Sequence, residues 1–180
     1  RGIMRYDVAI IGGGPAGMMA AIAASENSSS VVLLEKNPKL GRKLLITGGG
    51  RCNITNQKPI KTLLNIYPQK NFLKHSFYTL TNEKLLSFFE DRGLNFIEED
   101  NNRIFPETER SRDILEVLTY YLKDVVIRYN FEVNSISDDF IINNEIKANK
   151  IIIATGGVTY PQTGCNIKNY SLTSQPLTDI

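Results

Sequence analysis

Two runs of consecutive apolar residues near the N-terminus predict buried β-strands. They cover residues 6–11 (YDVAII) and 31–35 (VVLLE), and neither alternates with polar residues as a strand with one solvated face would. Between them, residues 18–25 (MMAAIAAS) have high helix propensity and contain no helix breaker. Strand, helix and strand together fill about 30 residues, which is the length of one βαβ unit.

Helical periodicity returns in the middle of the chain. It predicts one helix over residues 82–92, with Asn82 as its N-cap and Gly93 as its stop signal. A second helix is predicted over residues 111–123, with Ser111 as its cap. Each helix carries an apolar face, formed by Leu85, Leu86 and Phe89 in the first and by Ile114, Leu115, Leu118, Tyr121 and Leu122 in the second.

The segments around these helices have weaker patterns. Residues 36–56 are rich in Gly, Lys and Arg and are expected to form loops around a short element, while residues 60–80 are expected to be helical in part. We interpret Glu98-Glu99-Asp100 as a solvated acidic turn. His75 is the only histidine and is expected at the surface or in helix packing, so we expect no metal site.

The last third of the chain predicts further strands. Residues 125–129 and 150–154 (KIIIA) are strand candidates. Residues 131–148 are expected to form a small antiparallel meander with a turn at Asp138-Asp139. The order of elements predicts an α/β fold with a mostly parallel sheet, a three-stranded meander and a helical excursion over residues 58–123.

Composition agrees with an ordinary globular protein. Of the 180 residues, 42% are hydrophobic and 22% are charged, close to the globular averages of about 45–50% and 25%. These values exclude disorder, collagen and coiled coil as descriptions of the whole chain. We find no apolar run of about 18 residues and no secretory leader, so we expect a cytoplasmic protein in which Cys52 and Cys165 are free thiols.

Charge is distributed unevenly along the chain. Residues 1–75 hold 11 basic and 3 acidic side chains, whereas residues 76–180 hold 10 basic and 16 acidic ones. An anionic ligand is therefore expected to bind the first part. We do not expect nucleic acid as a partner, because no stripe of basic and aromatic residues is visible along the sequence.

A glycine pattern follows the first strand and opens the first helix. Gly12-x-Gly14-x-x-Gly17 has the strand, turn and helix context of a dinucleotide-binding loop. Its glycines allow a tight turn, approach of a pyrophosphate and close packing of helix on strand. Glu35 ends the second strand, where a carboxylate accepts ribose hydroxyls and repels a 2′-phosphate, which favours FAD or NAD over NADP. The alternative is a glycine turn without a ligand and a solvated Glu35.

Two further glycine segments indicate close approach to a ligand. Gly41-Arg42-Lys43 precedes Thr47-Gly48-Gly49-Gly50-Arg51-Cys52-Asn53, which combines three glycines with cations and lacks the spacing of a P-loop. Thr155-Gly156-Gly157 follows a strand whose carboxyl end should lie beside the first glycine loop. The alternatives are a flexible loop with solvated charges and a simple turn at a strand end.

Four segments of the chain resemble the BaiN-like family of flavoproteins, also called aminoacetone-oxidase-like or NAD(P)/FAD-dependent oxidoreductases. They are GGGPAGMMAA, LLEKNPKLGRKLLITGGGRCNITN, NRIFPETERSRDILEVL and IIIATGGVTYPQTG. The resemblance covers residues 4–164 and implies a Rossmann-like FAD-binding domain of the glutathione-reductase type. We expect residues 165–180 to be a divergent or truncated C-terminal segment.

The resemblance implies FAD as the cofactor and suggests how the chain would hold it. The first glycine loop would bind the pyrophosphate, the end of the second strand the adenosine ribose, and the second glycine segment the pyrophosphate and flavin side. The backbone of Val133 would contact the adenine, and the segment after the last strand would close over the cofactor. The implied binding residues are Gly12, Gly13, Gly14, Pro15, Ala16, Gly17, Glu35, Lys36, Arg42, Lys43, Gly48, Gly49, Gly50, Arg51, Cys52, Asn53, Val133, Ala154, Thr155, Gly156 and Gly157.

Members of this family are considerably longer and complete the site with an inserted domain and a returning segment. We therefore expect a flavoprotein oxidoreductase, as a fragment or a naturally short form, with NAD(P)H as a candidate electron donor and a small-molecule substrate. We assign no catalytic acid or base. Two alternatives stay open, namely a non-catalytic FAD- or ADP-binding module and a subunit that associates through residues 160–180. An NAD-only dehydrogenase is disfavoured because the second glycine segment has no role there.

Overall fold

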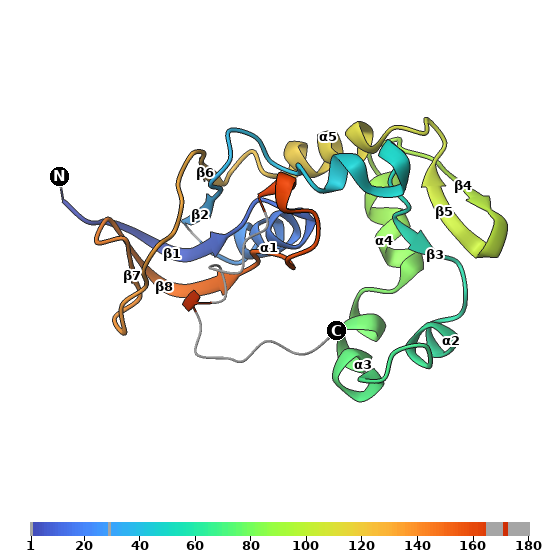
Figure 1. Cartoon of the computed structure of the whole chain (residues 1–180), viewed down its shortest axis with the longest axis horizontal. Helices are drawn as coiled ribbons and strands as arrows, with labels where there is room; N and C mark the ends of the chain where they lie inside the picture. The colour runs from blue at the N-terminus through green and yellow to red at the C-terminus, as the bar shows by residue number, and fades with distance from the viewer. Residues whose placement is uncertain (1, 29, 165–170, 173–180) are drawn as a thin grey trace. The chain divides into compact units, whose positions relative to one another are not determined.

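The computed structural model describes residues 2–28, 30–164 and 171–172. The chain forms two compact units: a parallel-sheet unit (Arg1–Lys43 and Leu118–Ile180) and an insert unit (Leu44–Val117) (Figure 1). Cys165, and most of the segment of residues 160–180 that we predicted to associate with a partner, lie outside the described residues. None of the helices in the described ranges has the length and apolar character that a membrane crossing requires.

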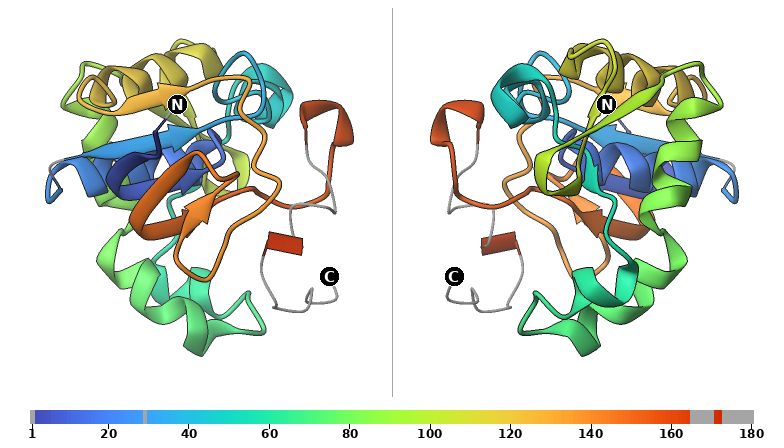
Figure 2. Two further views of the ribbon diagram at one scale, coloured as in Figure 1. Left: turned by 90° about the vertical axis from the view of Figure 1, so that its left-hand side faces the viewer. Right: turned by 90° about the vertical axis from the view of Figure 1, so that its right-hand side faces the viewer.

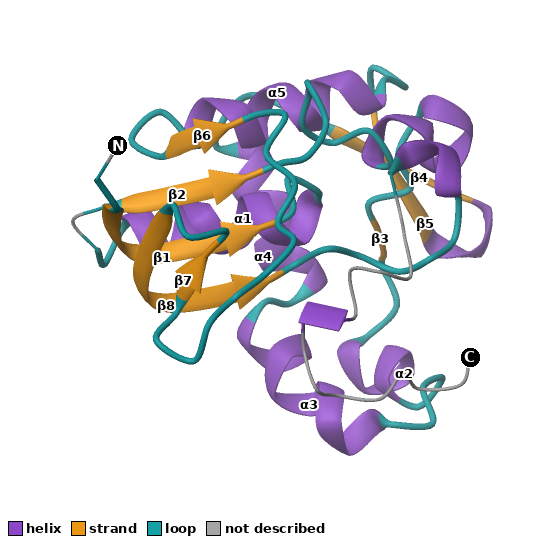
Figure 3. Ribbon diagram, turned by 60° about the vertical axis from the view of Figure 1, so that its left-hand side comes forward, coloured by secondary structure: helices purple, strands orange, loops and turns teal. Residues whose placement is uncertain are grey.

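The parallel-sheet unit is built around a five-stranded sheet in the order β6-β2-β1-β8-β7 (Figure 3). Only β7 runs antiparallel to its neighbour, and α1 lies against one face of the sheet. The elements are β1 (Met4–Ile11), α1 (Pro15–Ser25), β2 (Val31–Leu34), β6 (Val126–Arg128), β7 (Ile141–Ile142), β8 (Ile146–Ile153) and the short 3-10 helix η3 (Pro161–Thr163).

Burial explains why the two apolar runs become strands. All four residues of β2 and the last four of β1 are buried, and each buried Val, Leu or Ile side chain contributes about 1.5–3 kcal/mol relative to an exposed one. Small residues of α1 such as Ala21 let the helix approach the sheet closely. A hydrophobic cluster of strand and loop residues completes the core: Ala9, Ile11, Val32, Leu34, Phe131, Ile142, Ile146 and Ala148.

The strand register brings three strand ends together. Ile11 at the end of β1 pairs with Leu34 at the end of β2 on one side and with Ile153 at the end of β8 on the other. Because β1, β2 and β8 are parallel, the loops that follow them emerge at the same edge of the sheet. The chain passes from β1 to β2 on one side, whereas β8 lies on the other, so this edge is a switch point where ligands of such sheets bind.

The meander is smaller than predicted, although the turn at Asp138-Asp139 is present. Only the two residues of β7 form a ladder with β8, and Ile136 adds a single bridge to Ile142. Farther from the turn, the side chain of Asn143 accepts hydrogen bonds from the backbone of Asn134 (2.8 Å) and Ser135 (3.2 Å). These side-chain contacts add to backbone hydrogen bonds from Asn143 to Ser135 and from Ser137 to Ile141, both of 3.0 Å.

The insert unit contains strands as well as the helices of the excursion predicted over residues 58–123. It contains an antiparallel sheet in the order β3-β5-β4 in addition to its helices. Its elements are the 3-10 segment η1 (Leu44–Gly50), β3 (Thr55–Asn56), α2 (Ile60–Leu64), α3 (Lys70–Thr79), α4 (Asn82–Glu90), β4 (Phe96–Glu99), η2 (Asp100–Asn102), β5 (Arg103–Pro106) and most of α5 (Ser111–Tyr121).

Strands β4 and β5 overturn the interpretation of residues 98–100 as a solvated turn. Glu98 and Glu99 belong to β4, and only Asp100 lies in the turn that follows. The strands have four residues each, and β4 is only half-buried. Such short strands carry too few apolar residues for a clear pattern of alternation.

Two helix caps differ from the prediction. The N-cap of α4 is Thr81, whose hydroxyl accepts from the backbone N–H of Lys84 at 3.2 Å. The Asn82 side chain is buried and donates instead to the carbonyls of Asn56 (2.8 Å) and Lys58 (3.1 Å). The Ser111 hydroxyl donates to the Leu45 carbonyl at 2.9 Å, so both polar side chains join distant segments of the unit.

Candidate functional site

A pocket lies at the carboxyl edge of the parallel sheet, where β1, β2 and β8 end. The pocket has a volume of about 160 Å³. The following cofactor-binding residues predicted from the sequence line the pocket: Gly12, Gly13, Gly14, Pro15, Ala16, Glu35, Lys36, Arg42, Lys43, Val133, Ala154, Thr155 and Gly156. The structure therefore brings the first and third glycine segments and the end of β2 to one place.

Three glycines of the first loop have different structural roles. A Cβ atom on Gly12 would overlap the backbone of Ala154, and Gly12 has a φ of +107°. A Cβ atom on Gly17 would overlap the carbonyl oxygen of Gly12, so Gly17 permits the contact between α1 and the end of β1. A Cβ atom on Gly14 would meet no protein atom within 4 Å. The space at Gly14 thus belongs to the pocket, not to the protein core.

The first turn of α1 faces this space. Gly14 is the N-cap in an extended conformation, Pro15 is the first helical residue, and the N–H of Met18 donates to the Gly14 carbonyl at 2.9 Å. Pro15 has no N–H and sits where none is needed, whereas the N–H groups of Ala16 and Gly17 have no partner within the helix. They carry the partial positive charge of the helix N-terminus, which suits a phosphate.

Glu35 is 7% exposed and ties the glycine loop to the end of β2. Its carboxylate accepts from the Gly13 N–H at 2.7 Å, the Asn37 N–H at 2.8 Å and the Asn37 side-chain amide at 2.6 Å. A carboxylate offers about four acceptor positions, so these contacts leave room for a hydroxyl from the pocket. Glu35 therefore orders the loop as well as lining the site.

The charge of the pocket wall suits an anion. Lys36, Lys39, Arg42 and Lys43 contribute four cations, against the carboxylates of Glu35 and Glu132. Lys39 was missed by the sequence prediction, although it stands between two predicted residues in the same cationic segment. Phe131, Thr163 and Gly164 were missed because nothing in their local pattern points to a ligand, and only the fold brings them to the pocket.

Arg42 and Lys43 also hold the segment that follows β8. The Arg42 guanidinium donates to the Asn37 side chain at 2.8 Å and to the Gln162 carbonyl at 3.1 Å. The Lys43 ammonium donates to the hydroxyl (2.6 Å) and the carbonyl (3.0 Å) of Thr159. These contacts fasten one wall of the pocket to the other, which a simple strand-end turn would not require.

The second glycine segment belongs to the insert unit. Gly48, Gly49, Gly50 and Cys52 all have positive φ, between +55° and +89°. At Gly48 a Cβ atom would lie 2.7 Å from the backbone nitrogen of Asn53 and 3.0 Å from the Phe105 ring. The run of glycines therefore has a structural reason of its own, and a role of residues 48–53 at the cofactor stays a prediction.

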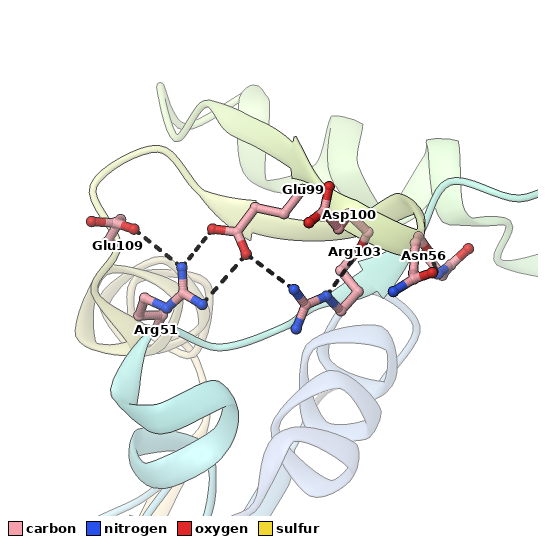
Figure 4. A network of polar contacts seen from close by, with 7 residues as sticks. Arg51, Asn56, Glu99, Asp100, Arg103 and Glu109 are labelled. Carbon is pink, nitrogen blue, oxygen red and sulfur yellow. Dashed lines mark hydrogen bonds and ion pairs between the residues drawn. The ribbon is translucent and has the colours of Figure 1, made fainter.

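Arg51 is held by carboxylates within the insert unit (Figure 4). Its guanidinium contacts Glu99 at 2.6 Å and Glu109 at 3.1 Å and lies 4.2 Å from the centroid of the Phe105 ring. Hydrogen bonds to Glu99 and Glu109 raise the pKa of Arg51 above its ordinary value. Arg103 contacts Glu99 from the other side at 3.5 Å. These contacts fix the glycine segment to β4 and the loop before α5, and the predicted role of Arg51 toward a bound anion stays a prediction.

Cys52 is a free and buried thiol. Burial raises the pKa of Cys52, and a hydrogen bond with Thr47 opposes this shift. Since the thiolate is the reactive form, the environment of Cys52 favours a structural role. His75 is exposed on α3, in agreement with the prediction of a surface position.

The chain is similar in sequence to curated enzymes. It is 28% identical over 179 residues to a ribosomal RNA dihydrouridine synthase from Escherichia coli (95% of this chain, 44% of that protein). The Haemophilus influenzae protein of the same name is 27% identical over 178 residues (92% and 44%). A 3-dehydro-bile acid delta(4,6)-reductase from Clostridium scindens is 32% identical over 178 residues (92% and 42%). The chain thus spans less than half the length of these relatives.

Solved structures share the fold. A 3-ketosteroid-delta4-(5alpha)-dehydrogenase from Rhodococcus jostii RHA1 has a TM-score of 0.66 at 16% identity, covering 89% of this chain and 47% of that one. A flavocytochrome c3 fumarate reductase has a TM-score of 0.57 at 18% identity (87% and 34%). The fold is the mixed α/β, Rossmann-like fold of FAD-binding proteins, which confirms the predicted fold class.

The chain also matches a model of a protein family. The HI0933-like protein Rossmann domain matches residues 6–180. This match confirms the family resemblance found in the glycine segments, because it covers them all. The chain belongs to the HI0933-like family and comprises its Rossmann domain.

Proposed function

We propose that the chain is the FAD-binding part of a flavin-dependent oxidoreductase. The observation that carries this proposal is the open space at Gly14, bounded by the N-terminus of α1 and the cationic wall of Lys36 to Lys43. This space suits a pyrophosphate, because N–H groups, a helix dipole and lysines converge on it. FAD, when bound, would supply the redox chemistry, and the protein would supply binding and orientation.

Different residues of the pocket would contact different parts of the cofactor. The N–H groups of Ala16 and Gly17 would donate to the phosphates, and Lys39 would balance their charge. The remaining acceptor position of Glu35 would receive a ribose hydroxyl, which keeps the expected preference for FAD over a 2′-phosphorylated nucleotide. The contacts of Arg42 and Lys43 with the segment after β8 would exclude water from the pyrophosphate. We further propose a cytoplasmic location and NAD(P)H as the electron donor.

The names of the relatives suggest candidate substrates for the whole protein. The relatives are named for ribosomal RNA and for a bile acid, which are chemically very different substrates. Both names describe products or reactions of reduction, so we propose that the whole protein reduces its substrate. Ribosomal RNA is the candidate that the similarity to two proteins named for it favours.

Titration with parts of the cofactor tests the proposal. ADP should bind the chain and displace FAD, because it carries the pyrophosphate and ribose that the pocket fits, whereas FMN should not compete. Binding of FMN without binding of ADP would contradict the assigned pocket. Anaerobic bleaching of bound flavin by NADPH would then separate an oxidoreductase from a non-catalytic binding module.

Glu35→Ala is expected to weaken ADP and FAD binding by about 1–3 kcal/mol, because charge-assisted hydrogen bonds are lost. The matched control is Glu132→Ala, which removes the same charge from an exposed residue of the pocket rim. This control should leave the affinity unchanged or raise it slightly. Calorimetric titration of ADP measures both variants, and equal effects would remove Glu35 from its specific role.

A further inference from the structure

Asn37 lies between the carboxylate of Glu35 and the guanidinium of Arg42 and contacts both. Its backbone N–H and its side-chain amide donate to the Oε1 oxygen of Glu35, at 2.8 Å and 2.6 Å. The amide oxygen of Asn37 accepts from Arg42 at 2.8 Å. A carboxylate on one side and a cation on the other fix the orientation of this amide, because only its nitrogen donates and only its oxygen accepts. No sequence pattern singles out Asn37 as a functional residue.

The two carboxylate oxygens of Glu35 have different contacts. Oε1 accepts twice, both times from Asn37, whereas Oε2 accepts once, from the N–H of Gly13 at 2.7 Å. Each carboxylate oxygen offers about two acceptor positions. Among the described residues, Oε1 is therefore fully used and Oε2 keeps one position open. Asn37 thus determines which oxygen of Glu35 is available to a ligand in the pocket.

Close packing keeps the Glu35 and Asn37 side chains in place. A Cβ atom on Gly13 would lie 2.9 Å from Oε2 of Glu35, and a Cβ atom on Gly164 would lie 2.9 Å from the amide nitrogen of Asn37. The two glycines therefore let backbone segments approach both polar side chains. The Asn37 carbonyl also accepts from the N–H of Asn130 at 3.2 Å. The backbone of Asn37 is thus held independently of its side chain.

The Asn37 side chain also keeps Arg42 from pairing with Glu35. No ion pair joins Arg42 to Glu35 in the part of the chain that the structure describes. Arg42 donates instead to Asn37 and, at 3.1 Å, to the carbonyl of Gln162 in η3 (orange-red in Figure 2). A direct pair would occupy the open position of Glu35 and bring a cation to the end of the pocket proposed for the ribose. An arginine at that position accommodates a 2′-phosphate.

We propose that Asn37 is a positioning residue that makes the pocket select a ribose with free hydroxyls over one with a 2′-phosphate. It leaves Oε2 of Glu35 open to a ribose hydroxyl and holds Arg42 away from the ribose. This role of Asn37 rests on the proposed function, in which Glu35 receives the adenosine ribose. It adds a residue outside the predicted binding set, and this residue controls discrimination at the 2′ position.

Calorimetric titration of the full chain with ADP-ribose and 2′-phospho-ADP-ribose tests this role, because the two probes differ only in the 2′-phosphate. Asn37→Ala should weaken binding of ADP-ribose about tenfold, since Glu35 loses one of the hydrogen bonds that position it. The variant should bind 2′-phospho-ADP-ribose at least as well as the wild type does, because Arg42 is released. The ratio of the two affinities should therefore fall at least about tenfold.

A double-mutant cycle separates positioning from a general ordering of the pocket wall. In a Glu35→Ala background, Asn37→Ala should leave the affinity for ADP-ribose unchanged, because Asn37 acts on this affinity through Glu35. An equal loss in both backgrounds would overturn the proposal. Asn37→Asp keeps the side-chain volume and the acceptor for Arg42 but sets a second carboxylate against Glu35. It should weaken ADP-ribose binding at least as much as Asn37→Ala does.

The matched control is Asn149→Ala. The Asn149 amide also donates to a carboxylate of the parallel-sheet unit, that of Asp7 at 3.3 Å, but neither residue lines the pocket. This variant should bind both probes as the wild type does, and thermal unfolding should show that it and the Asn37 variants are folded. An equal fall of the affinity ratio in Asn149→Ala and Asn37→Ala would overturn the proposal.

The wild-type titration separates this role from the proposed function. A wild type that binds neither ADP-ribose nor FAD would contradict the proposed function and the role of Asn37 together. A wild type that binds ADP-ribose, with an Asn37→Ala variant that keeps the wild-type affinity ratio, would contradict the role of Asn37 alone.

Discussion

Replacing Gly14 with Val is expected to abolish FAD retention without unfolding the protein. The new side chain would enter the space where the pyrophosphate is proposed to bind, since a Cβ atom there meets no protein atom within 4 Å. Gly14 has a φ of −79° and a ψ of −179°, which valine adopts easily before a proline. Loss of two charge-assisted hydrogen bonds to phosphate amounts to about 3 kcal/mol, or a loss of affinity of about a hundredfold.

Two measurements on the Gly14→Val protein separate binding from folding. Calorimetric titration should show the loss of ADP and FAD affinity, and thermal unfolding of the cofactor-free protein should match the wild type. Unchanged flavin content in this variant would place the phosphates elsewhere. A large fall in thermal stability would mean that Gly14 is packed against protein.

Gly17→Ala is expected to destabilise the protein, although the substitution improves helix propensity. Alanine in a helix is favoured over glycine by about 1 kcal/mol, but here its Cβ atom would overlap the carbonyl oxygen of Gly12. Both atoms belong to backbone-fixed positions of α1 and the loop after β1, so the helix must shift. Such overpacking costs about 1–3 kcal/mol and sometimes more, which outweighs the gain in propensity.

Urea unfolding of wild type and Gly17→Ala decides between these two effects, because they have opposite signs. A lower free energy of unfolding supports the close packing of α1 on the sheet. A higher free energy of unfolding would mean that the helix lies farther from β1 than described. Gly14→Ala serves as the control with open space and should leave stability nearly unchanged.

The βαβ unit could be predicted because its pattern is local. Continuous apolar runs such as residues 31–34 specify buried strands, and the glycine loop between strand and helix has a fixed spacing. Strands β4 and β5 could not be predicted, since they are only four residues long and carry too few apolar residues for a clear alternation. Asn82 and Ser111 were assigned as caps because their side chains suit that role. Tertiary contacts with Asn56 and Leu45 use these side chains instead.

The pocket could be predicted only where its residues form a local sequence pattern. The residues of the first glycine loop and Glu35 are recognisable from spacing, and the structure brings them together with Ala154 to Gly156. The second role of Glu35, as acceptor from Gly13 and Asn37, follows from distances that no sequence pattern contains. The partners of Arg51 could not be predicted either, because Glu99 and Glu109 come from segments with no visible relation to it in the sequence.

The visible absorption spectrum of the purified protein tests the central claim most directly. Heat release and chromatography then identify any chromophore. The account predicts flavin absorption bands and stoichiometric FAD, or uptake of added FAD that ADP prevents. A colourless protein that binds neither FAD nor ADP would contradict the assignment of the pocket at Gly14 and Glu35.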